Sequence, residues 1–268
     1  MRLPVLGPRC TKSLSRLTFS VRLMLAVSAS AVPLGAQDHP HEPLAFKPIT
    51  HQPFDVDLDG GWERRRGDRF SLVLDRQAPC SPPGVGRVSF GRGFPGGSGP
   101  ANLYYDIPAG YRKLYVSFCV RLSPNWVGHR SGVNKILHFW IADRNHAIIS
   151  ATGSGSGRLT PQFRLQALAD AKSARNLGVR SGRAIERGRW QRVELIIASN
   201  TPGIANGRVQ WWVDGQLAGD FSQLPFVGPG EDADWRRVSW NPTWGGTGGS
   251  ILAEQYMDID DLYISGGV

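Results

Sequence analysis

The segment Asn206-Gly-Arg-Val-Gln-Trp-Trp-Val-Asp-Gly-Gln216 decides the fold class. Its residues alternate in character, so that Val209, Trp211 and Val213 fall on one side of an extended chain. Gln210 and Trp212 fall on the other side. This period of two predicts a β-strand with one buried face and one outward face.

Short segments of this kind recur along the chain between Gly and Pro residues. They are Phe70–Leu74, Arg87–Phe90, Leu103–Tyr105, Lys113–Leu122, Asn134–Ala142, Ala147–Ala151, Gln162–Ala167, Trp190–Ala198, Arg208–Asp214 and Met257–Ser265. Only residues 167–177 allow a helix, and a loop at a strand edge fits them equally well. About ten strands without intervening helices, and without a fixed repeat, predict an all-β sandwich or barrel.

The first 36 residues have the composition of a secretory signal peptide: they hold five basic residues, no acidic residue and a short apolar run. Small residues place the cleavage site after Ala31 or Ala36. Residues 37–53 are rich in Pro and His, which predicts a lead-in without packed structure. Residues 54–268 are then one domain, and the protein is expected to be secreted or periplasmic.

The charge of the chain changes once the leader is set aside. The full sequence has 31 Lys and Arg residues against 22 Asp and Glu residues, a net charge of +9. Without residues 1–36 the excess is only +4, which permits an acidic glycan as partner. Glu63 and Asp68 interrupt the basic cluster at Arg64–Arg66, which together with export argues against nucleic acid. No apolar run reaches the roughly 18 residues of a membrane-spanning helix.

Two cysteines remain after the leader, Cys80 and Cys119. An exported protein can oxidise such a pair to a disulfide. Two buried thiols are the alternative.

Three segments near the C-terminus carry a resemblance to a known superfamily. Arg189–Asn200 contains a W-x-x-V-E strand, Asn206–Gln216 contains N-G-x-V-x-x-W-V-D-G, and Met257–Ser265 contains I-D-D followed by L-Y-I-S. Together they resemble the concanavalin A-like jelly-roll superfamily, which includes polysaccharide lyases, laminin-G-like modules and legume-type lectins. The resemblance implies an all-β fold, a two-sheet antiparallel jelly-roll sandwich.

Several predicted strands have an outward face of amide, guanidinium, imidazole and aromatic side chains. Such side chains suit sugars, because rings stack on apolar sugar faces and amides hydrogen-bond hydroxyls. An ordinary solvated sheet face is the alternative. The predicted sugar-contacting residues are Asn134, His138, Trp140, Gln162, Arg164, Gln166, Gln210 and Trp212.

Within the superfamily, Lys135-Ile-Leu-His138 loosely resembles the Q-I-H strand of alginate-lyase-like enzymes. That resemblance implies that His138 abstracts a proton from C5 of a uronate and that Tyr105 or Tyr115 protonates the leaving oxygen. It also implies a cluster that neutralises the substrate carboxylate, formed by Arg164 with Asn134, Gln162 and Gln166.

The first hypothesis is therefore a secreted lyase that cleaves a uronate-containing polysaccharide by β-elimination. A non-catalytic carbohydrate-binding module and a structural surface module are the alternatives. The E-x-D-x-x-E strand of retaining glucanases is absent, which argues against that glycosidase chemistry. No cofactor is expected, although Asp258, Asp260 and Asp261 could hold a structural calcium ion, with hydrogen bonding to loops as the alternative.

Overall fold

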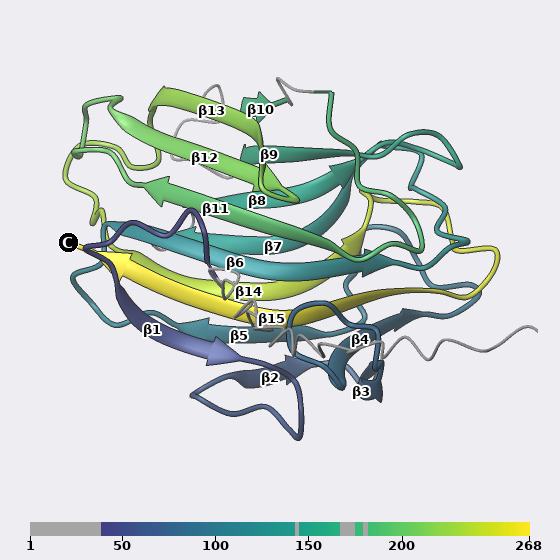
Figure 1. Ribbon diagram of the computed structural model, residues 1–268. Helices are drawn as coiled ribbons and strands as arrows, with labels where there is room; N and C mark the ends of the chain where they lie inside the picture. The colour runs from purple at the N-terminus through teal and green to yellow at the C-terminus, as the bar shows by residue number, and fades with distance from the viewer. Residues whose placement is uncertain (1–38, 143–144, 167–174, 179–181) are drawn as a thin grey trace, which may run out of the picture. The chain divides into compact units, whose positions relative to one another are not determined.

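The computed structural model describes residues 39–268 apart from 143–144, 167–174 and 179–181. The predicted signal peptide lies outside the described residues. All regular structure in the described part is β-strand, arranged in two antiparallel sheets (Figure 1). The predicted all-β, two-sheet fold is thus confirmed. Of the segment that allowed a helix, Arg175–Leu177 forms the short strand β10, and residues 167–174 are not described.

Fifteen strands make up the described part of the two sheets. One sheet contains β1 (Lys47–Gln52), β3 (Phe70–Leu74), β4 (Gly84–Phe90), β6 (Lys113–Leu122), β11 (Gln191–Ala198), β12 (Gly207–Val213), β13 (Gln216–Leu224) and β15 (Gln255–Gly267). The other contains β2 (Glu63–Arg66), β5 (Asn102–Asp106), β7 (Asn134–Ile141), β8 (Asn145–Thr152), β9 (Thr160–Gln166), β10 (Arg175–Leu177) and β14 (Trp235–Trp244). The eight-stranded sheet has the order β13-β12-β11-β6-β15-β4-β3, with β1 also paired to β15. The seven-stranded sheet has the order β10-β9-β8-β7-β14-β5-β2.

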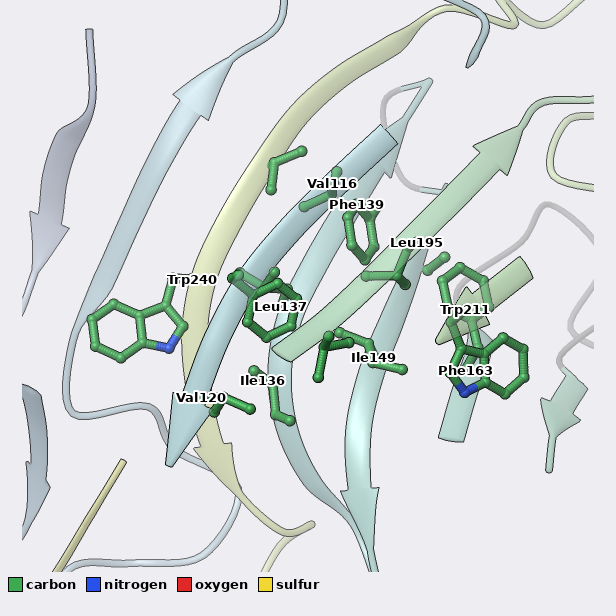
Figure 2. Close-up of a cluster of buried hydrophobic side chains, with 14 of the residues drawn as sticks. Val116, Val120, Ile136, Leu137, Phe139, Ile149, Phe163, Leu195, Trp211 and Trp240 are labelled. Atoms are coloured by element: carbon green, nitrogen blue, oxygen red, sulfur yellow. The ribbon is translucent and has the colours of Figure 1, made fainter. Parts of the chain in front are cut away.

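The core lies between the two sheets and follows the alternation of their strands. Figure 2 shows Val116 and Val120 of β6 and Leu195 of β11 together with Phe139 of β7 and Phe163 of β9. These side chains are at most 1% exposed, as are those of the neighbouring core residues. Because residues two apart share a face, the residues between them point out of the sandwich.

A β-bulge changes the alternation at the start of β7. The register with β8 shifts between Lys135 and Leu137, so Ile136 and Leu137 are both buried. A bulge inserts one extra residue and moves every residue before it to the other face. Lys135, and not Asn134, therefore shares the outward face with His138.

The predicted lead-in is not a linker, which corrects the boundary at residue 54. Residues Lys47–Gln52 form β1 and pair with the second half of β15. Ahead of β1, His39 stacks on Tyr263 with ring centroids 3.9 Å apart, and His41 stacks on Trp212 at 4.3 Å. We call residues 39–46 the N-terminal strap, since it lies on the outer face of the eight-stranded sheet.

The same outer face contains the disulfide and the aspartates of β15. Cys80 and Cys119 are bonded, with Cα atoms 6.5 Å apart. Asp258 accepts hydrogen bonds from two arginines, Asp260 from Ser81, and Asp261 lies 2.7 Å from the Nε2 atom of His51. The three carboxylates therefore bond separate groups of the protein and do not converge on one point. Their partners are cationic and hydroxyl groups of the protein, and a structural calcium ion at these carboxylates stays a prediction.

Within the described ranges, no helix is long and apolar enough to cross a membrane. In the same residues, no three His, Cys, Asp or Glu side chains come together as metal ligands.

Candidate functional site

Strand register builds a row of polar side chains across the outer face of the seven-stranded sheet. Ser239 of β14 pairs with His138 of β7 on one side and with Tyr104 of β5 on the other. His138 pairs with Ile148 of β8, which in turn pairs with Arg164 of β9. Directly paired residues have their side chains on the same face. Strands distant in sequence thus bring an imidazole, a guanidinium and a phenol onto one surface.

Lys135 and Arg164 give this face an uncompensated positive charge. Burial lowers the pKa of Lys135, and the nearby charge of Arg164 lowers it further. Burial also lowers the pKa of Arg164. In the part of the chain that the structure describes, neither side chain forms an ion pair with a carboxylate. Two half-buried cations that repel each other favour an anion placed between them.

A polar pocket of about 520 Å³ opens beside Lys135, and Arg164 lies on the same face outside its lining. Its lining includes Lys135 and His138 from β7 and Asn241 from β14, with Arg65 and Asn102 from the neighbouring strands and Gly97 to Gly99 from a loop. A Cβ atom at Gly99 would lie 2.3 Å from the side-chain oxygen of Asn241, so a side chain there would displace that amide. The pocket therefore presents amide, ammonium, guanidinium and imidazole groups to one volume.

His138 is held as a neutral imidazole. Its side chain is buried, and in the described residues neither ring nitrogen has a hydrogen-bond partner. Burial lowers its pKa to about 3, with further lowering from Lys135 and His146. The ring is parallel to that of His146, with centroids 5.9 Å apart and an interplanar angle of 7°. An unpartnered neutral imidazole on the pocket wall can accept a proton from a bound ligand.

A second, smaller pocket of about 370 Å³ lies further along β7 and β14 on the same face. It is lined by Asp106, Trp140, Ala142, Arg236 and Arg237. The indole nitrogen of Trp140 donates to the hydroxyl of Ser239 at 3.0 Å, and His146 packs against the indole with centroids 4.4 Å apart. These contacts fix the orientation of the indole.

Five of the residues predicted from the sequence lie together on this face. They are His138 and Trp140 of β7 and Gln162, Arg164 and Gln166 of β9. Gln162 accepts a hydrogen bond from Thr152 at 3.0 Å, and Gln166 pairs with His146 in the register.

The other predicted residues lie elsewhere, and their grouping with His138 is wrong. Tyr115, Gln210 and Trp212 belong to the eight-stranded sheet. Tyr115 is fully buried under the N-terminal strap and donates to Glu194 at 2.7 Å. Burial and that hydrogen bond raise the pKa of the Tyr115 hydroxyl far above its ordinary value. It is therefore no proton donor at the polar pocket.

Asn134 and Tyr105 are also displaced from the predicted site. The amide of Asn134 donates to the carbonyls of Ala151 and Gly153, so it stabilises the end of β8 and the turn that follows it. Tyr105 points inward and packs against Trp62, because it lies one residue from the outward-facing Tyr104.

Three residues of this face, Lys135, Tyr104 and His146, are not among those predicted from the sequence. Lys135 was missed because strict alternation ignores the β7 bulge. For Tyr104, the prediction named its neighbour Tyr105 instead, and neighbouring residues of a strand point to opposite faces. His146 was missed because the predicted strand began at Ala147, whereas β8 begins at Asn145.

Solved structures of polysaccharide lyases share this fold. Alginate lyase Aly36B, as a variant in complex with an alginate trisaccharide, aligns with a TM-score of 0.55 and 18% identity over 69% of this chain and 82% of the lyase. The endo-β-1,4-glucuronan lyase of the fungus Trichoderma reesei aligns with a TM-score of 0.58 and 14% identity over 82% and 96%. Alginate lyase vAL-1 from Chlorella virus aligns with a TM-score of 0.55 and 14% identity over 78% of this chain and 94% of the lyase. The chain thus shares the two-sheet, antiparallel jelly-roll fold of these lyases.

At the level of sequence, no protein-family model matches the chain, and no curated protein matches it. The common fold is therefore established by structure alone.

Proposed function

We propose that the protein is an exported lyase that cleaves a uronate-containing polysaccharide on the outer face of the seven-stranded sheet. The observation that carries the proposal is the placement of Lys135, Arg164 and the neutral His138 on one face, where Lys135 and His138 line a polar pocket. The lyase structures with the same fold support the reaction class. The basic, acid-free leader supports export.

The chemistry follows from the charges on this face. Lys135 and Arg164 would hold the uronate carboxylate and neutralise it, which acidifies the hydrogen on C5. The neutral imidazole of His138 would take that proton, the C4–O4 bond would break, and a double bond would form between C4 and C5. Binding of the carboxylate would also offset the charge of Lys135, which, after burial, is the second cause that lowers the pKa of His138. Substrate binding would thereby strengthen the base.

The leaving oxygen needs a proton, and Tyr104 is the tyrosine on this face within the described residues. Its hydroxyl donates to Glu63, and that hydrogen bond raises its pKa above the ordinary value. Tyr104 lies two strands from His138, so their Cα atoms are about 10 Å apart at ordinary strand spacing. A sugar that lies over β14, the strand between β5 and β7, would contact both side chains.

This separation favours a second function, a carbohydrate-binding module without catalysis. In that case the same cations bind the carboxylate, while no acid reaches the glycosidic oxygen. The two functions differ in one product, the unsaturated uronate that only β-elimination generates.

The test incubates purified protein with polyuronates and follows the ultraviolet absorbance of the unsaturated product, in parallel with calorimetric binding. A lyase gives a rise in absorbance that His138→Asn abolishes while binding changes by only a few-fold. Lys135→Ala and Arg164→Ala should each weaken binding by about tenfold or more, the value of a lost charge-assisted hydrogen bond. The matched control is Lys113→Ala, since Lys113 is an exposed cation on the eight-stranded sheet.

If polyuronate binds and Lys135→Ala weakens that binding, but the absorbance does not rise, the protein is a carbohydrate-binding module and not a lyase. If neither Lys135→Ala nor Arg164→Ala changes the affinity, the binding site is not on this face.

A further inference from the structure

The two pockets on the outer face of the seven-stranded sheet differ in charge. In the polar pocket, Lys135 and Arg65 have no carboxylate partner among the described residues. The second, smaller pocket is called the Trp140 pocket below. The positive charges of both its arginines are compensated, because Arg237 pairs with Asp106 and Arg236 pairs with Asp232. One end of the face therefore attracts an anion, and the other end is close to neutral.

Both pockets are built on the same two strands, so one extended ligand can occupy both. Lys135 and Trp140 are five residues apart on β7, a distance of about 16 Å at the ordinary strand rise. Across β14, Thr243 pairs with Lys135 and Arg237 pairs with Trp140. A span of this length holds more than one sugar residue, with His138 between its ends.

The Trp140 pocket has the composition expected for a neutral sugar. A half-buried indole of fixed orientation offers an apolar platform to the face of a sugar ring. The Asp106 carboxylate lies beside it and would repel a second carboxylate. A neutral sugar meets no such repulsion, and its hydroxyls can bond both members of the Asp106–Arg237 pair.

We infer that the preferred substrate is a mixed polysaccharide, in which a uronate lies next to a neutral sugar, and not a homopolymer of uronate. This inference depends on the function proposed above. The uronate occupies the pocket of Lys135 and His138, and the neutral neighbour stacks on Trp140. The structural relatives named above act on alginate and glucuronan, so the charge of the second pocket would set this protein apart in specificity.

The experiment measures calorimetric affinities in the His138→Asn variant, which prevents consumption of the ligand. The probes are oligosaccharides of equal length: hyaluronan and deacylated gellan as mixed polymers, and glucuronan and alginate as homopolyuronates. At least one mixed probe should bind about tenfold more tightly than both homopolyuronates, and Trp140→Ala should remove most of that preference. Tighter binding of a homopolyuronate would overturn the inference.

A second variant tests the inference through a gain of affinity for a polymer made of uronate alone. Asp106→Asn leaves Arg237 without its carboxylate and turns the neutral pocket into a cationic one, so the affinity for glucuronan should rise several-fold. The matched control is Asp220→Asn, which removes the carboxylate from Arg208 on the other sheet and should leave the affinity unchanged. An unchanged glucuronan affinity in Asp106→Asn would refute the neutral subsite.

These outcomes separate the inference from the proposed function. Homopolyuronate binding that depends on Lys135 keeps the proposed function and rejects the mixed substrate. Absence of binding to every uronate polymer rejects both.

Discussion

Replacing His138 by a side chain that does not titrate should reduce the loss of stability on acidification, measured as the fall in the free energy of unfolding below pH 6.5. The imidazole is 5% exposed, and burial lowers its pKa in the folded protein to about 3 from the ordinary 6.5. As pH falls below 6.5, the unfolded chain takes up a proton that the folded protein cannot accept until near pH 3. The unfolded state therefore gains stability, and the free energy of unfolding falls as pH falls.

The size of this effect follows from the two pKa values. At pH 7 the contribution is close to zero, and at pH 5 it has removed about 2 kcal/mol from the free energy of unfolding. The full loss, below pH 3, is about 5 kcal/mol. Two kilocalories per mole is a large part of the stability of an ordinary domain, so the difference is measurable.

Urea unfolding at pH 7 and pH 5 provides the assay, with His138→Asn and His138→Phe as variants. Both variants will change the stability at pH 7, and that change does not matter. The informative quantity is the loss between the two pH values, which should be about 2 kcal/mol larger in the parent protein than in either variant. Equal losses in parent and variants would refute the buried neutral imidazole.

Three further predictions concern the eight-stranded sheet. The hydrogen bond to Asp261 raises the pKa of His51, so His51→Asn should make the acid-side loss of stability steeper in the same urea assay, the opposite sign to His138. Replacing Cys80 and Cys119 by Ser opens a loop with a sequence separation of 39 and should lower the free energy of unfolding by about 4 kcal/mol relative to the oxidised parent, and the reduced parent should match the variant. Tyr115→Phe should leave polyuronate binding unchanged, since the hydroxyl is buried on the other sheet, and a loss of binding would return Tyr115 to the site.

The sequence predicts the sandwich well because alternation is a local property. Val209, Trp211 and Val213 are buried as their spacing requires, and so is the apolar set of β6. Neither depends on knowing which strands are neighbours.

The site is harder to predict because it depends on register and on pairing across the chain. A single extra residue in β7 moves Lys135 to the outer face and buries Asn134, and nothing in the local sequence marks the bulge. The assignment of Tyr115 failed for a different reason. An outward-facing strand residue is solvent-exposed only if no other segment lies on it, and the N-terminal strap covers this one.

The strap limits what each copy of the protein can do to a long polymer. With His39 and His41 packed on the aromatic rings of the eight-stranded sheet, the part of that face around Tyr115, Trp212 and Tyr263 is covered by the chain itself. Under the proposed function, each copy then engages a glycan through the seven-stranded sheet alone, which makes one copy monovalent. It should bind a polysaccharide without crosslinking its chains, so that turbidity stays flat as protein is added, unlike the precipitation that bivalent lectins cause.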